Sequence, residues 1–220
     1  MSVEPTGFLY PFIDADERDA SGLLADLAAS ARAKIADSAS VRADALEQCR
    51  PVLDAAGAAM AQRFRRGGRV FAFGNGGSAT DADGAVDLFR APPRGRRLGA
   101  VSLVDDRAVL TALANDVGFD LVFSRQLIAH ARAVDIAIGF STSGNSVNVL
   151  VALDEAHRRA LLTIGLCGYD GGAMATTDTV DHCLVVRSDS VHRVQEAQAA
   201  LVLALWSAVQ RNLDEEIGDD

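Results

Sequence analysis

The stretch from Phe71 to Arg90 reads FAFGNGGSATDADGAVDLFR. Its first apolar residues are typical of a buried strand, which ends in the glycine-rich loop Gly74–Ser78. Glycines let a backbone approach a ligand closely, and a helix that begins after such a loop directs its N–H groups toward an anion. The stretch therefore predicts a strand, a loop and a helix, with an anion-binding loop and a plain tight turn as alternatives. The helical part contains neither histidine nor glutamate.

Short apolar runs alternate with helical segments from residue 69 onward. The runs are apolar on both faces, as expected of parallel strands that helices cover on each side. This order predicts a doubly wound α/β sandwich with a five-stranded parallel sheet. The expected strands are 69–73, 98–103, 135–140, 161–166 and 181–186, and the expected helices lie near 79–89, 106–115, 119–132, 146–157, 170–176 and 192–214.

The residues before this domain divide into a leader and a helical segment. Residues 1–15 form an irregular leader that contains proline, and residues 16–66 are rich in alanine and leucine at helical spacing. Interruptions at 38–40 and at Pro51 favour two or three helices, which could cap the core or form a dimer interface. We expect 16–214 to be one folded unit, with the main domain at 67–214 and an acidic tail at 215–220.

Composition narrows the class of protein. Of the 220 residues 49% are hydrophobic, which is normal for a globular fold, and the net charge of −9 disfavours binding to nucleic acid or to anionic membranes. The three cysteines have no C-x-x-C spacing, so a reducing cytoplasm is expected. No apolar run is long enough for a membrane span, and the N-terminus lacks the pattern of a signal peptide.

A second loop, Ser141-Thr142-Ser143-Gly144-Asn145-Ser146, directly follows the expected strand 135–140. Four hydroxyls around a glycine at the start of a helix can hold a phosphate without lysine. A plain helix cap would need only one of these hydroxyls. The loop has neither the Gly-Lys-Ser/Thr of a nucleotide-binding P-loop nor a G-x-G-x-x-G fingerprint, so a phosphate that belongs to something other than a nucleotide is favoured.

Together, five motifs resemble those of the sugar isomerase (SIS) domain of bacterial phosphoheptose isomerases. They are G-N-G-G-S at 74–78, A-N-D-x-G-F at 114–119, S-T-S-G-N-S at 141–146, G-x-D-G-G at 168–172 and R-x-Q-E at 193–196. The resemblance implies a three-layer α/β/α sandwich, a homotetramer with sites at subunit interfaces, and a sugar phosphate such as sedoheptulose 7-phosphate as ligand.

The resemblance also implies which residues bind the ligand. By this resemblance the hydroxyls of the second loop bind the phosphate. The first loop, residues 115–116 and the last helix bind the sugar. The implied binding residues are Asn75, Gly76, Gly77, Ser78, Asn115, Asp116, Ser141, Thr142, Ser143, Ser146 and Gln195.

The catalytic half of the pattern differs. Where the family resemblance implies a histidine, a glutamate and a second histidine, this sequence has Gly84, Leu88 and Leu203. Enediol chemistry needs a base beside the reacting carbons, and neither glycine nor leucine supplies one. Of the zinc ligands found in many family members only Gln195 remains, so neither zinc nor another cofactor is expected.

Two hypotheses follow. The first is a sugar-phosphate-binding protein that lacks isomerase activity and has a regulatory or partner-binding role. The second is an active sedoheptulose 7-phosphate isomerase with displaced groups, such as His192, Glu196 or Asp87. We interpret Asp81, Asp83 and Asp87 mainly as solvated charges of a helix N-terminus. The basic loop 92–97 could be a lip that attracts the ligand or a solvated turn.

Overall fold

The computed structural model describes residues 20–215, so the leader 1–15 and all of the expected tail except residue 215 lie outside the described residues. Contacts divide the chain into one unit that ends at Ser40 and another that begins at Val41. No helix among the described residues is long and apolar enough to cross a membrane. The domain bounds expected from the sequence stay a prediction.

The N-terminal segment forms two helices, α1 (Ala20–Gln48) and α2 (Arg50–Arg65). The break falls at Cys49, and Pro51 lies in the first turn of α2, where a missing N–H costs nothing. The interruption expected at 38–40 is wrong, because α1 continues through it. Serine weakens a helix interior by only a fraction of a kcal/mol relative to alanine, which does not end a long helix.

The sheet has five parallel strands in the order β2-β1-β3-β4-β5. Every residue of β1, β3 and β4 is buried, which confirms the expectation of strands covered on both faces. The strands are β1 (Val70–Gly74), β2 (Ala100–Ser102), β3 (Ile136–Ser141), β4 (Leu162–Gly168) and β5 (His182–Val186).

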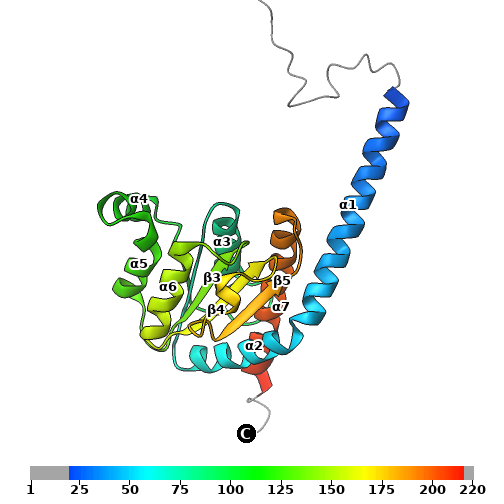
Figure 1. Ribbon diagram of the computed structural model, residues 1–220. Coiled ribbons are helices and arrows are strands. Elements are labelled where there is room, and N and C mark those ends of the chain that lie inside the picture. Colours follow the sequence, from blue (N-terminus) through cyan, green and yellow to red (C-terminus); the bar gives the residue numbers. More distant parts are fainter. Residues whose placement is uncertain (1–19, 216–220) are drawn as a thin grey trace, which may run out of the picture. The chain divides into compact units, whose positions relative to one another are not determined.

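Helices cover the two faces of the sheet and complete the predicted α/β sandwich (Figure 1). One apolar core joins the sheet to α2, α3 and α7, and the other joins it to α5 and α6. The helices after the first strand are α3 (Gly77–Arg90), α4 (Arg107–Asp116), α5 (Val122–His130), α6 (Val147–Arg158) and α7 (Val191–Glu215).

Two expected helices differ in form. The segment 119–132 divides into a 3-10 turn, Phe119–Leu121, and α5, while 170–176 holds only the 3-10 turn Ala173–Ala175. In the latter segment Gly171 and Gly172 have φ values of +99° and +55°, which a right-handed helix does not accommodate.

A buried carboxylate ties together the starts of β1 and β3. Asp135 is 0% exposed, and its two oxygens accept hydrogen bonds of 2.8 Å from the backbone N–H groups of Arg69 and Arg132. Gly74 at the end of β1 is in register with Phe140 of β3. The loops that follow these two strands therefore leave the same edge of the sheet side by side.

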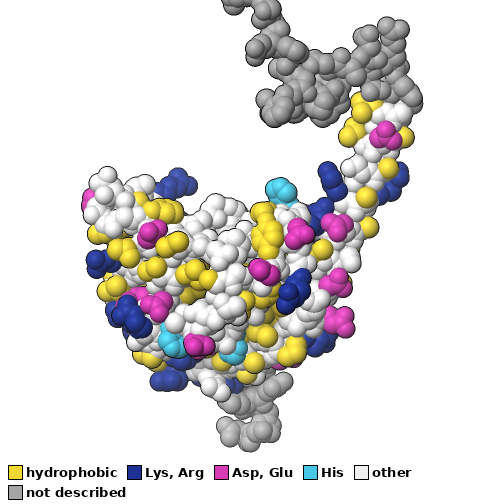
Figure 2. Space-filling view, in the orientation of Figure 1, with side chains coloured by type: hydrophobic (Ala, Val, Ile, Leu, Met, Phe, Trp, Pro, Cys, Tyr) yellow, Lys and Arg dark blue, Asp and Glu magenta, His cyan; other side chains and the backbone are white. Residues whose placement is uncertain are grey.

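Charged side chains of both signs are interspersed over the sheet-bearing part of the face in Figure 2. That face therefore carries no large patch of positive charge, which is what would attract a polyanion.

Candidate functional site

The two loops singled out in the sequence meet where the chain order of the sheet reverses. β1 is flanked by β2 on one side and by β3 on the other, so the helices after β1 and β3 leave toward different faces. Parallel sheets of this order bind ligands in the crevice outside the strand ends at that point. This position makes the two loops the candidate site.

The first loop presents backbone instead of side chains. Gly76 has a φ of +56° and precedes the first residue of α3, Gly77, and both glycines are exposed. Ser78 is buried, and its backbone N–H donates to the Asn75 carbonyl at 3.0 Å. The predicted binding residues Gly76 and Gly77 thus lie open at the N-terminus of α3, whereas the Ser78 side chain lies beneath them.

An asparagine pair fastens the first loop to the second. The Asn75 amide donates to Asn148 Oδ1 at 2.7 Å, and the Asn148 amide donates back to Asn75 Oδ1 at 2.9 Å. Asn148 lies in the first turn of α6 and is 3% exposed. The sequence analysis did not single out Asn148, although its position two residues after Ser146 placed it beside the second loop.

The second loop gathers its hydroxyls around Ser141, which is 2% exposed. Ser141 Oγ lies 2.8 Å from Ser146 Oγ and 3.5 Å from Ser143 Oγ. Ser146 is the N-cap residue of α6, yet its side chain makes no capping hydrogen bond. N–H groups in the first turn of α6 therefore remain available to an anion, together with the clustered hydroxyls.

The segment 168–172 packs closely against the backbone of this second loop. Gly144 has a φ of +67°, and a Cβ there would lie 2.0 Å from the Gly171 carbonyl oxygen. Asn145 Oδ1 accepts a 2.9 Å hydrogen bond from the Ala173 N–H, and the Asn145 amide donates to the Ser143 carbonyl. The G-x-D-G-G motif thus holds the second loop, Ser141–Ser146, in one conformation by close backbone contact. This loop is called the serine loop below.

Gln195 of α7 reaches the first loop and connects it to Asp81. Its amide lies where a Cβ on Gly77 would be, 2.2 Å from Gln195 Nε2, and that nitrogen donates to Asp81 Oδ2 at 3.2 Å. Burial raises the pKa of the Asp81 carboxyl above its ordinary value, while the hydrogen bond from Gln195 lowers it.

Gly84 and Leu88 line one cavity of about 210 Å³ between α3 and α7. The other lining residues are Thr80, Asp81, Ala85, Ala199 and Val202. Asp81 is the titratable residue of this set, and its side chain is half-buried, which differs in part from our interpretation of a solvated surface charge. Asp83 and Asp87 are exposed as expected. The i, i+3, i+7 spacing of 81, 84 and 88 could have revealed the common face.

Four other predicted residues stand apart from these contacts. Asn115 and Asp116 end α4, and their exposed side chains are hydrogen-bonded to one another at 2.8 Å. His192 is exposed at the start of α7, and Glu196 forms a 2.8 Å ion pair with Arg193. None of these four lines the cavity beside Asp81.

Leu203, the third altered position, also lies outside that cavity. Its side chain is 51% exposed on α7.

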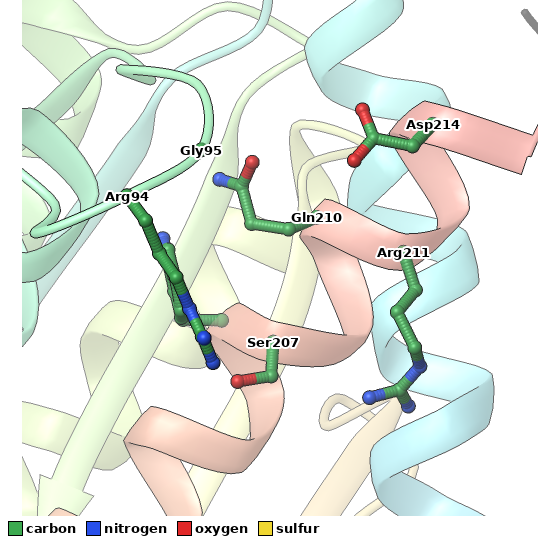
Figure 3. Close-up of a pocket in the computed structure, with 7 residues that line it drawn as sticks. Arg94, Gly95, Ser207, Gln210, Arg211 and Asp214 are labelled. Carbon is green, nitrogen blue, oxygen red and sulfur yellow. The ribbon is translucent and has the colours of Figure 1, made fainter.

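The basic loop 92–97 follows the far end of α3 and does not border the candidate site. Arg94 and Gly95 line a second cavity of about 360 Å³ together with residues of the C-terminal half of α7, including Ser207 and Gln210. Gln210 points toward the loop at Gly95, whereas Arg211 extends to the other side of α7 (Figure 3). The loop borders this cavity and not the candidate site, which disfavours the lip interpretation. Two hydrogen bonds between the Gln210 side chain and the Arg96 backbone anchor it there.

Comparison with known proteins identifies the class. The family model described as SIS domain matches residues 22–168, and the chain belongs to this family. Phosphoheptose isomerase of Roseiflexus sp. (strain RS-1) is 37% identical over 185 residues, covering 83% of this chain and 93% of the relative. Phosphoheptose isomerase of Geobacter sp. (strain M21) is 38% identical over 165 residues, covering 74% and 85%.

Solved structures agree with the family. The phosphoheptose isomerase GmhA from Neisseria gonorrhoeae has 37% identity and a TM-score of 0.76, covering 84% of this chain and 99% of its own. A phosphoheptose isomerase from Francisella tularensis has 28% identity and a TM-score of 0.77. This chain thus resembles phosphoheptose isomerases over most of its length, which confirms the family and the fold expected from its motifs.

We predict that Asn148→Ala lowers the free energy of unfolding by about 1–3 kcal/mol, because it leaves the Asn75 amide without its partner. Urea denaturation measures the loss. Asn212→Ala is the matched control, because the Asn212 side chain donates only to a carbonyl of its own helix, that of Ala208. Equal losses in the two variants would contradict a special role for the asparagine pair.

Proposed function

We propose that this chain binds a phosphorylated sugar between the Gly74–Ser78 and Ser141–Ser146 loops and does not interconvert its aldose and ketose forms. The observation that carries the proposal is the cavity beside Asp81. Two of its lining positions, Gly84 and Leu88, are those where the family resemblance implies a histidine and a glutamate. Binding residues are retained while groups for proton transfer are replaced.

The binding half of the proposal is supported by the serine loop and by the relatives. The Oγ atoms of Ser143 and Ser146 lie 3.5 Å and 2.8 Å from Ser141 Oγ. All three hydroxyls lie beside the uncapped N-terminus of α6. Such a group of donors suits the several acceptor oxygens of a phosphate. The relatives are phosphoheptose isomerases by name, so a seven-carbon sugar phosphate is the first ligand to test.

The residues around the cavity do not suit a zinc ion. Gly84 and Leu88 offer no ligand atom, so Asp81 is the single carboxylate on the cavity wall, which has neither histidine nor cysteine. Zinc sites in proteins are built from cysteine, histidine and carboxylate ligands, usually three or four together. Among the described residues no group of three or more such side chains could hold a metal. We therefore assign no step to zinc.

A second candidate, isomerisation by displaced groups, is favoured by one observation. Asp81 lines the cavity, and burial raises the pKa of its carboxyl above its ordinary value. Asp81 is thus a better candidate base than exposed His192 or ion-paired Glu196. It has no second acid or base beside it on the cavity wall, which is why the binding function stands first.

Replacing Ser141 and Ser143 by alanine should weaken the binding of sedoheptulose 7-phosphate by at least about tenfold per hydroxyl. A hydrogen bond to a charged acceptor contributes about 1.5–3 kcal/mol. Calorimetry measures the two affinities, with Ser207→Ala, on the other cavity, as control. If phosphorylated and unphosphorylated sugar bind the unmodified protein equally well, the phosphate site is refuted.

We predict no turnover of sedoheptulose 7-phosphate above background, with or without added zinc. A positioned acid or base contributes about 10²–10⁴-fold, and the positions of two such groups are Gly84 and Leu88. An NMR assay of the sugar tests this. Robust turnover that Asp81→Asn, His192→Ala or Glu196→Gln abolishes would place isomerisation first and assign the base.

We also propose that the chain forms a homotetramer. In this reading the tetramer has a regulatory role and acts through a protein partner. Exposed apolar side chains on α1 and α7 support association. They are Leu23, Leu24, Leu27 and Ile35 on α1 and Leu203 on α7. Light scattering should give about four times the chain mass of 23.1 kDa at micromolar concentration. A mass near one chain would exclude the shared-site assembly.

A further inference from the structure

The cavity between α3 and α7 has an unusual wall for a site that receives a polyhydroxylated sugar. Its side chains are mainly apolar, from Ala85, Leu88, Ala199 and Val202, and Gly84 adds open space. A Cβ built on Gly84 would meet no atom within 4 Å. Thr80 and Asp81 provide the polar part of the wall.

The cavity adjoins the first loop through Gln195. The Gln195 amide lies against Gly77 on one side and donates to Asp81 on the other, and Asp81 is itself part of the cavity wall. Gln195 therefore connects the exposed backbone of Gly76 and Gly77 to one residue of the cavity wall.

A sugar hydroxyl placed against this wall would lose hydrogen bonds to water without finding equivalent partners, which disfavours it there. An apolar group would instead gain about 0.8 kcal/mol for each CH2 buried. Leucine and alanine methyl groups thus favour a ligand that differs from a plain polyol phosphate at this point.

We infer that the ligand is a sugar phosphate with a short apolar substituent, such as an acyl group of two to four carbons, which enters this cavity. The inference rests on the proposed sugar-phosphate-binding function and specifies its ligand class. The cavity has room for such a group, since its volume of about 210 Å³ exceeds the roughly 30 Å³ of one water molecule several-fold. The Asp81 carboxylate is placed to accept a hydrogen bond from an amide that links the acyl group to the sugar.

The test is a homologous series of N-formyl, N-acetyl, N-propionyl and N-butyryl glucosamine 6-phosphate, whose members differ only in CH2 groups. Calorimetry should show affinity for the unmodified protein rising by about fourfold per CH2 until the cavity is filled. Sedoheptulose 7-phosphate is measured in parallel as the unsubstituted sugar phosphate.

The variant Gly84→Leu should remove this rise, because its side chain occupies the open space above residue 84. The control Asp87→Leu, at an exposed position of the same helix, should retain it. Circular dichroism of both variants checks that α3 is intact.

The outcomes separate this inference from the proposed function. No binding of any of these sugar phosphates overturns both. Binding of sedoheptulose 7-phosphate without binding of the acyl series, or an acyl series of equal affinity, overturns the inference and leaves the proposed function standing. A rise that persists unchanged in Gly84→Leu overturns the assignment of the acyl group to this cavity.

Discussion

The reciprocal hydrogen bonds between Asn75 and Asn148 are the contact on which the candidate site depends. They connect the loop after β1 to the first turn of the helix after β3, two segments that are far apart in the sequence. Each neutral hydrogen bond has a net value of only about 0.5–1.5 kcal/mol, but a buried amide left without a partner costs more. The pair therefore fixes the distance between the glycine loop and the serine loop more firmly than its bond energies suggest.

A second constraint acts from behind the serine loop. Gly144 and Gly171 approach so closely that no side chain fits at residue 144, and Asn145 is bonded to the Ala173 N–H. These contacts hold the hydroxyls in one arrangement before any ligand is present. Because binding then orders few side chains, less of the interaction energy is lost to conformational entropy. Close backbone packing thus serves a loop that contains no lysine or arginine.

Much of the fold could be predicted from local patterns. Runs apolar on both faces identified the strands, and hydroxyl- or glycine-rich loops directly after two of them identified the candidate site. The interruption at 38–40 and the helix at 170–176 were wrong for a common reason: local propensity was read without its context. Serine does not end a long helix, and Gly171 and Gly172 require positive φ values. The partial burial of Asp81 was not predicted because it depends on Gln195 of α7, which is distant in sequence.

Two glycines of the candidate site are required for different physical reasons. Gly144 combines a positive φ with a backbone oxygen 2.0 Å from the place of a Cβ, so any other residue there would disturb the fold itself. Gly77 is opposed only by the end of the Gln195 side chain, which can rotate away at little cost to stability. An alanine at 77 would leave a folded protein whose glutamine no longer reaches Asp81. Stability therefore requires glycine at 144 but not at 77, where a side chain would act on the Gln195–Asp81 contact and not on the fold.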